Sequence, residues 1–153
     1  MKKIKVAALV LAIAMFALCA VSCGNKAEKV KVNCTFSVII NDEVMLDQFP
    51  YTVEGTVDNP PTILQAAQEA FQMAEVPCEV DSEGLSLQSL TFDGTKYSNG
   101  MDDENIYMWY YTINGVEPDK NGGRAGKRPI EEGQNICYIY SATPINPQEF
   151  SEE

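Results

Sequence analysis

The sequence predicts an α+β domain in which one amphipathic helix lies across a mixed sheet of four to five strands. Three observations support this prediction. Residues 30–40 alternate apolar and polar side chains with the period of two that is typical of a half-buried strand. Residues 62–76 place apolar side chains at helical spacing, and shorter alternating runs follow residue 85. The expected order is therefore strand, strand, helix and then strands.

The first strand and the next alternating run, over residues 49–53, are expected to form a hairpin around Asn41-Asp42-Glu43. Pro50 lies in the second run and has no N–H to donate. We therefore expect this strand at a sheet edge, or with a break at Pro50. Farther along, a change of parity near Gln88 and Ser89 within residues 85–92 predicts a bulge or two short strands.

The helix is expected to begin at Thr62, directly after Asn59-Pro60-Pro61. Thr62 and Gln65 fit a capping box, in which the threonine oxygen accepts from the first turn and Gln65 reaches back. Pro77 is expected to end the helix near Val76. One stripe is apolar and is interpreted as the side that packs on the sheet: Ile63, Leu64, Ala67, Ala70, Phe71 and Ala74.

The densest aromatic segment runs from Tyr107 to Ile113 and contains the single tryptophan, Trp109. Its composition and period of two are typical of a strand, and Asn114-Gly115 favours a tight turn after it. We interpret it as a central strand, with the last strand over residues 135–141. One parity of its side chains is expected to pack under the helix, which leaves only the other parity for a ligand.

Residues 1–22 have the pattern of a signal peptide, a lysine-containing head followed by an apolar run over residues 6–21. The run is shorter than the ~20 residues that span a membrane. The segment Ala20–Asn25 resembles the lipobox of bacterial lipoproteins, although Ala20 stands where Leu is usual. This resemblance implies cleavage before Cys23, a lipid on its thiol and an extracytoplasmic, membrane-anchored protein. Ordinary secretion with cleavage near Ser22 is the alternative.

The predicted mature chain comprises a tether over residues 23–29, a domain over residues 30–142 and an acidic tail over residues 143–153. Removal of residues 1–22 takes away three lysines and no acid, leaving 8 basic and 22 acidic residues and a net charge of −14. This charge argues against nucleic acid and against electrostatic adhesion to anionic lipid. The expected membrane contact is the N-terminal lipid.

The three cysteines of the predicted domain, Cys34, Cys78 and Cys137, are compatible with one disulfide and a free thiol or with three reduced thiols. The chain has no histidine and no Cys-x-x-Cys, so we expect no zinc or redox centre. Residues 102–105 are acidic but match no EF-hand loop, and a solvated turn is the expectation. No nucleophile has a recognisable partner, so we expect no catalytic residues and no enzyme, with a thiol enzyme as the alternative.

Three motifs resemble the transcobalamin-like C-terminal domain family, also known as a domain of unknown function in bacterial lipoproteins. They are Thr62–Ala67 at the helix start, Trp109-Tyr110-Tyr111-x-x-Asn114-Gly115, and Pro129–Ile136 before the last strand. Gln134 departs from the Asp usual in the third motif. The resemblance implies a β-grasp roll, in which the first and last strands lie side by side at the centre. It also implies a corrinoid such as cobalamin as a possible ligand, contacted from the region of Trp109 and the following loop.

The candidate ligand-binding residues are Trp109, Tyr111, Asn114, Gly122, Gly123 and Arg124. Trp109 and Tyr111, with Tyr138 and Tyr140, are hypothesised to form a stacking platform, or else to fill the core. The loop over residues 119–128 holds four basic residues and several glycines, whose backbone could approach an anionic group. We thus expect an extracytoplasmic module for a small ligand. A surface module that binds another exported protein, or is purely structural, is the alternative.

Overall fold

The computed structural model describes residues 27–118 and 123–145. The predicted signal peptide, the lipidated Cys23 and the candidate Gly122 lie outside the described residues, as do the start of the tether and most of the acidic tail. The described chain is α+β, as predicted, with one helix and two sheets. No helix in these ranges is long and apolar enough to cross a membrane.

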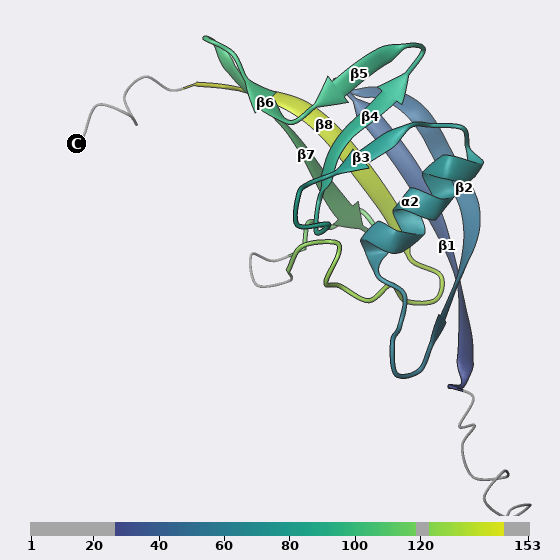
Figure 1. The fold of residues 1–153 in the computed structure, drawn as a ribbon. Helices are drawn as coiled ribbons and strands as arrows, with labels where there is room; N and C mark the ends of the chain where they lie inside the picture. The colour runs from purple at the N-terminus through teal and green to yellow at the C-terminus, as the bar shows by residue number, and fades with distance from the viewer. Residues whose placement is uncertain (1–26, 119–122, 146–153) are drawn as a thin grey trace, which may run out of the picture.

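The larger sheet has five strands in the order β2-β1-β8-β7-β6 (Figure 1). Its first and last strands along the chain pair in parallel inside the sheet, and the other pairs are antiparallel. The size and mixed character of this sheet agree with the prediction. The strands are β1 (Lys29–Ile40), β2 (Glu43–Thr56), β6 (Gly100–Met101), β7 (Asn105–Ile113) and β8 (Asn135–Pro144).

A second, three-stranded sheet is not predicted by the sequence pattern. It consists of β3 (Cys78–Val80), β4 (Leu87–Phe92) and β5 (Thr95–Ser98), in that order. The bulge predicted from the parity change near Gln88 and Ser89 is confirmed, because Glu79 pairs with Ser89 and Val80 with Leu87, which leaves Gln88 as an extra residue in β4. This small sheet and helix α2 (Ile63–Met73) cover the same face of the larger sheet (Figure 1).

The predicted hairpin of β1 and β2 is confirmed, and β2 is an edge strand, as the position of Pro50 indicates. The turn residues Asn41 and Asp42 both adopt positive φ, of 48° and 68°. β2 is much longer than predicted. In residues 43–48 the apolar and polar side chains do not alternate clearly. Register shifts between Phe36 and Ile39 of β1 interrupt the pairing with this part of β2.

The N-terminus of helix α2 lies where the sequence predicts it. Thr62 Oγ1 accepts a hydrogen bond from the Gln65 backbone N–H at 3.2 Å. The other half of the predicted capping box is wrong, because the Gln65 side chain donates to Glu69 Oε1 at 3.1 Å instead. The helix is therefore capped by one side-chain bond.

The helix ends at Met73, before the predicted end near Val76. Glu75 adopts a left-handed φ of 58°, and the Val76 N–H donates back to the Phe71 carbonyl at 2.8 Å. Such a reversal satisfies the last carbonyls and stops the helix ahead of the proline.

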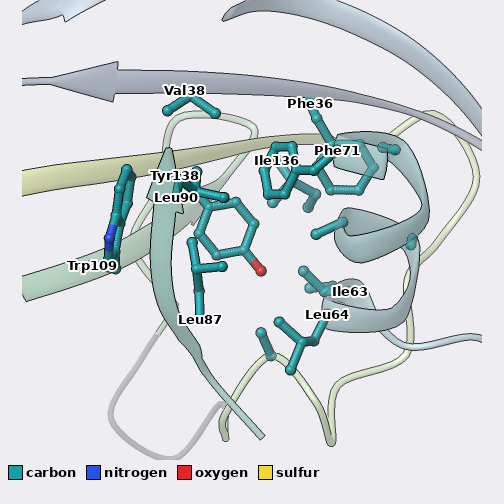
Figure 2. Packing of buried hydrophobic residues seen from close by; sticks show 14 of the residues in the cluster. Phe36, Val38, Ile63, Leu64, Phe71, Leu87, Leu90, Trp109, Ile136 and Tyr138 are labelled. Atoms are coloured by element: carbon teal, nitrogen blue, oxygen red, sulfur yellow. The ribbon is translucent and has the colours of Figure 1, made fainter. Parts of the chain in front are cut away.

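Between helix α2 and the larger sheet lies the hydrophobic core (Figure 2). The Phe71 ring makes edge contacts with Phe36 and Tyr138, at centroid distances of 6.0 and 5.8 Å. Leu87 and Leu90 of β4 join the same cluster. The predicted stripe is buried except for the half-buried Ala74, and Ala66 joins it.

β7 has a neighbour on both sides, as predicted for residues 107–113, but the middle strand of the sheet is β8. β7 pairs with β8 along its whole length and with β6 only at Ile106 and Tyr107. The middle position of β8 depends on its parallel pairing with β1, which the aromatic content of β7 does not predict. β8 also continues to Pro144, two residues past the predicted domain boundary.

The single cap at Thr62 makes the stability of helix α2 sensitive to that residue. We expect Thr62→Ala to lower the free energy of unfolding by about 1 kcal/mol, because the Gln65 N–H loses its acceptor. Thr62→Ser keeps an oxygen at the cap and should stay close to wild type. Urea denaturation followed by far-UV circular dichroism measures both, and equal losses in the two variants would contradict this role.

Candidate functional site

A cavity of about 270 Å³ lies where strand β4, strands β7 and β8 and the segments over residues 117–118 and 124–125 meet. We call it the seam cavity. It brings together three side chains singled out above as ligand or platform candidates, Trp109, Tyr111 and Tyr138, and adds Arg124. The other lining residues are Ser86, Leu87, Tyr110, Glu117, Pro118 and Ala125.

Trp109 is held firmly in the wall of the seam cavity. Only 8% of its surface is exposed, and its ring packs on Tyr140 at a centroid distance of 4.9 Å. Its indole N–H donates to the Tyr97 carbonyl at 2.9 Å, and its backbone N–H donates to Asn99 Oδ1 at 2.7 Å. Trp109 can therefore offer a ligand ring surface but no free hydrogen-bond donor.

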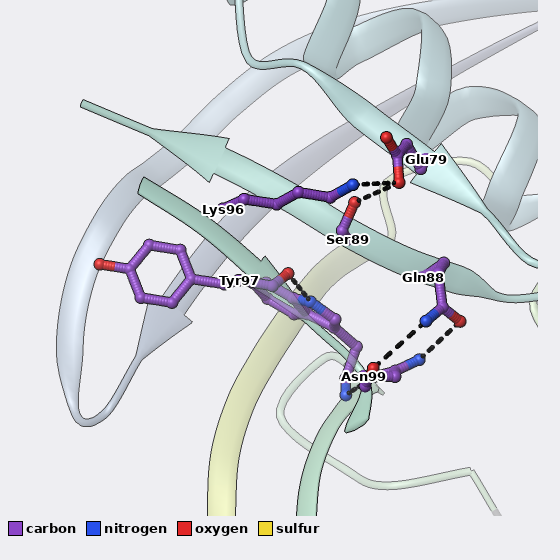
Figure 3. Close-up of polar contacts among 7 residues, drawn as sticks. Glu79, Gln88, Ser89, Lys96, Tyr97 and Asn99 are labelled. Carbon is purple, nitrogen blue, oxygen red and sulfur yellow. Dashed lines mark hydrogen bonds and ion pairs between the residues drawn. The ribbon is translucent and has the colours of Figure 1, made fainter. Parts of the chain in front are cut away.

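Asn99 ties strand β7 to the three-stranded sheet beside the cavity. While its side-chain oxygen accepts from Trp109, its amide donates to the Leu87 carbonyl at 3.0 Å. The Gln88 side chain adds a bond to the Asn99 carbonyl at 3.3 Å (Figure 3). Because these bonds link two sheets, they fix the distance between the Trp109 and Leu87 walls.

The segment over residues 123–130 closes the end of the seam cavity. The carbonyls of Ala125 and Arg128 accept from the Leu64 and Ile63 N–H groups, at 3.1 and 2.9 Å. Its Gly126 packs so closely on the 81–86 turn that an added Cβ would lie 2.7 Å from Leu85 Cα. Gly126, one of the glycines of the 119–128 loop, thus lets another part of the backbone approach. The N–H groups of Ile63 and Leu64 at the helix start are already bonded.

Arg124 lies at the mouth of the cavity with its charge already compensated. Its guanidinium pairs with the Glu83 carboxylate and lies 3.9 Å from Asp81 Oδ2. Hydrogen bonding from the Leu85 backbone, assisted by Arg124, lowers the pKa of Asp81. Glu117 adds a further carboxylate to the lining.

Tyr138 lines the seam cavity, but its hydroxyl is buried in the protein. Its ring packs between Phe71 and Tyr111, and its hydroxyl has no hydrogen-bond partner. Figure 2 shows this hydroxyl pointing away from β8, between Leu87 and the first turn of the helix. Burial raises the pKa of Tyr138 well above its usual range, so the group is a neutral phenol.

The remaining candidates from the sequence have structural partners. Tyr111 lines the cavity, and its hydroxyl donates to the Gly123 carbonyl at 3.2 Å. Asn114 lies outside the lining, where its side-chain oxygen accepts from the Asn135 N–H at 2.8 Å and shapes the turn after β7. Tyr140 belongs to the core and donates to the Ser98 carbonyl at 2.9 Å.

The sequence predicts that a ligand can use only the face of residues 107–113 that does not pack under the helix. This expectation needs a correction at the seam cavity. Trp109 and Tyr111 are on the covered face of β7, whereas Met108 and Tyr110 are exposed on the other face. A ligand site on the covered face is possible because two separate elements cover it and leave a space between them. The contributions of Leu87 and Ala125 could not be foreseen, since both look like ordinary core residues in the sequence.

A larger open depression of about 580 Å³ lies along β1 and β2, with Cys34 and Tyr51 in its lining. Its polar groups are already paired. The Tyr51 hydroxyl donates to Glu69 Oε2 at 2.9 Å, and the Asn33 amide donates to Glu132 Oε1 at 2.9 Å. This depression therefore offers a ligand fewer unsatisfied groups than the seam cavity does.

All three cysteines of the described chain are free thiols, so the structure supports the reduced alternative. Burial raises the pKa of each, that of Cys34 to about 11. The thiol form, which is the weaker nucleophile, therefore predominates at neutral pH. In the acidic 102–105 turn, Asp102 Oδ1 accepts the N–H groups of Glu104 and Asn105. No cluster of three or more possible metal ligands occurs within residues 27–118 and 123–145.

Comparisons with known proteins give little guidance for this chain. No family model and no curated protein matches it. A solved structure from Ruminococcus gnavus ATCC 29149, named "putative metal binding protein", is similar at 20% identity and a TM-score of 0.41. The match covers 73% of this chain and 98% of that one. A likeness this loose establishes neither a fold family nor a ligand.

The unpaired Tyr138 hydroxyl should be costly in the ligand-free protein. We expect Tyr138→Phe to raise the free energy of unfolding by about 1 kcal/mol, because the ring contacts stay and an unsatisfied polar group is removed. The matched variant Tyr140→Phe removes a hydroxyl that is bonded, and should lower stability by about 1 kcal/mol. Urea denaturation measures both. A loss of stability in both variants would show that the Tyr138 hydroxyl has a partner.

Proposed function

We propose that this chain is a lipid-anchored, extracytoplasmic module that binds a small molecule in the seam cavity. The observation that carries the proposal is the cavity itself, with Trp109, Tyr111 and Tyr138 in its lining. A concave, mostly apolar site with a few polar groups is the usual form of a small-molecule site. Thiols that are weak nucleophiles favour binding over catalysis.

The proposed location rests on the sequence around Cys23. If the lipid is attached there, six residues lead to the start of β1 at Lys29. At most about 20 Å of extended chain would then separate the lipid from the domain. The domain would be held close to the membrane.

We also propose a relation to the β-grasp fold and to the transcobalamin-like C-terminal domains. The parallel pairing of β1 with β8 inside the sheet and the helix that crosses it support this relation. A corrinoid is much larger than the seam cavity, whose volume of about 270 Å³ is below the usual range for drug-sized ligands. Only a peripheral group of a corrinoid could enter, and its ring would lie across the mouth.

Titration of the chain with small neutral ring compounds tests the proposal, with Trp109 as its single tryptophan reporter. We expect a saturable change in Trp109 emission that disappears in Ala125→Leu, because the larger side chain fills the cavity. Ala142→Leu makes the same change at an exposed position of β8 and should bind like wild type. A response that survives in Ala125→Leu would contradict the site.

The same variants test the corrinoid version. A change in corrin absorbance at micromolar cobalamin in wild type, and its loss in Ala125→Leu, would support contact at the mouth. No absorbance change up to high micromolar concentration would remove the corrinoid from consideration and leave the smaller ligands.

A second candidate function, binding to another exported protein, is favoured by the face of the larger sheet that turns away from helix α2. The strand registers place Val44, Ile39, Ile139 and Tyr110 in one row across four strands. Val44 is 57% exposed and Tyr110 is 36% exposed. An exposed apolar surface of this kind is typical of a protein contact. The strong negative charge disfavours a second copy and favours a partner with a neutral or basic rim.

This second candidate predicts a different pattern of variants. The double substitution Val44→Ser with Met108→Ser should abolish a stoichiometric cross-link to the partner on intact cells, because it makes the exposed face polar without changing a residue of the seam cavity. Ala125→Leu should leave that cross-link unchanged. A cross-link lost only in Ala125→Leu would instead place recognition at the seam cavity.

A further inference from the structure

Strand β7 has an outer edge that is only partly paired. In an antiparallel pair, every second residue directs its N–H and C=O groups to the partner strand, and the residues between direct theirs away. The Asn114 N–H donates to the Asn135 carbonyl at the start of β8, at 2.7 Å. By this alternation, the backbone groups of Trp109, Tyr111 and Ile113 point away from β8.

Two of these three residues are bonded on the outer side. The Trp109 N–H donates to Asn99 Oδ1 at 2.7 Å. Ile113 and Val116 exchange two backbone hydrogen bonds, at 2.9 and 3.0 Å. Tyr111 lies between them, and its N–H and C=O groups have no hydrogen-bond partner in the part of the chain that the structure describes. Tyr111 is therefore an unpaired position between two paired ones.

Pro118 explains why the chain itself does not pair with Tyr111. The antiparallel pairing of Ile113 with Val116 begins a hairpin whose continuation would place residue 118 opposite Tyr111. Proline has no N–H to donate to the Tyr111 carbonyl, and the pairing stops after Val116. The chain leaves the edge instead, and Glu117 and Pro118 line the seam cavity together with Tyr111.

The seam cavity reaches this edge of β7. Its lining includes Trp109, Tyr110 and Tyr111, three consecutive residues of the strand. Their side chains alternate between the two faces of the sheet, so a cavity that touches all three meets the strand at its edge. The same cavity extends onto the covered face, where Leu87 and Ala125 line it. A ligand at this place can bond to the backbone of Tyr111 and fill an apolar recess at the same time.

Building on the proposed function, we infer that the ligand of the seam cavity is an extended peptide, one residue of which pairs with Tyr111. The peptide extends the antiparallel pairing that β6 begins on the same edge. Such a pair requires an N–H and a C=O on the two sides of one Cα, which a peptide has and a simple ring compound lacks.

The geometry of the pair also places one side chain of the peptide. Residues opposite each other in an antiparallel pair direct their side chains to the same face. Tyr111 is on the covered face, so the side chain of the paired residue points into the recess beside Leu87 and Ala125. A cavity of about 150 Å³ holds benzene. The seam cavity, at about 270 Å³, therefore accommodates a leucine or phenylalanine side chain.

Amide hydrogen exchange of the full chain, followed by nuclear magnetic resonance, tests the pairing directly. Without ligand, the Tyr111 amide should exchange about tenfold faster than the bonded Ile113 amide. Saturation with N-acetyl-leucinamide should slow the exchange of Tyr111 about tenfold, because the leucine carbonyl accepts its N–H, and should leave that of Ile113 unchanged.

Two methylated forms of this compound separate backbone pairing from simple filling of the recess. A methyl group on the leucine nitrogen removes the N–H that donates to the Tyr111 carbonyl, and should weaken binding about tenfold, the loss expected for one hydrogen bond. A methyl group on the terminal amide, whose N–H points away from β7, should leave the affinity unchanged. Ala125→Leu should abolish binding of all three compounds, and Ala142→Leu should bind them like wild type.

The outcomes separate this inference from the proposed function. If the Tyr111 amide of the ligand-free protein exchanges as slowly as that of Ile113, its edge is already occupied and the inference is wrong. Protection that rises with protein concentration would identify that occupant as a second copy of the chain. If the two methylated compounds bind equally, the cavity is a binding site without strand pairing. If no peptide or ring compound changes the emission of Trp109, the proposed function falls as well.

Discussion

The length of helix α2 sets the rest of the architecture. Its 11 residues extend about 16 Å, whereas the outer strands of a five-stranded sheet lie about 19 Å apart. One such helix, lying over the β1 and β2 side, cannot cover the apolar side chains of β7 and β8 as well. The three-stranded sheet completes the cover through Leu87 and Leu90. The seam cavity lies beside this cover, between Leu87 of β4, strands β7 and β8 and the 124–125 segment.

The segment over residues 123–130 is best understood as part of this cover. It bonds to the first turn of the helix through the Ala125 and Arg128 carbonyls and to the 81–86 turn through Gly126. Its composition suggests an anion-binding loop, but its backbone groups are bonded within the protein, and Arg124 pairs with Glu83. The segment therefore serves as a wall of the seam cavity through Arg124 and Ala125 rather than as a separate anion site.

The two faces of β7 have different roles because only one of them is covered. Trp109 and Tyr111 are fixed by bonds to Tyr97 and Gly123, so they form a rigid wall that binding need not reorganise. Met108 and Tyr110 on the open face are not enclosed in this way. A small ligand and a protein partner would thus meet opposite sides of the same strand, which is why variants on the two faces separate the two functions.

By itself the sequence determined the α+β class, the first hairpin, the edge position of β2 and the start of the helix at Thr62. These features depend on the local period of apolar side chains, on the N–H that Pro50 lacks and on the Thr62 cap, which bonds the N–H three residues later. The aromatic candidates Trp109 and Tyr111 were also accessible, since alternation places them on one face. Only the tertiary structure decided that β8 is the middle strand, that a second sheet exists and that the Tyr138 hydroxyl is buried without a partner. Each of these depends on pairing or packing between segments far apart in the chain, and the unpaired hydroxyl is defined only by what surrounds it.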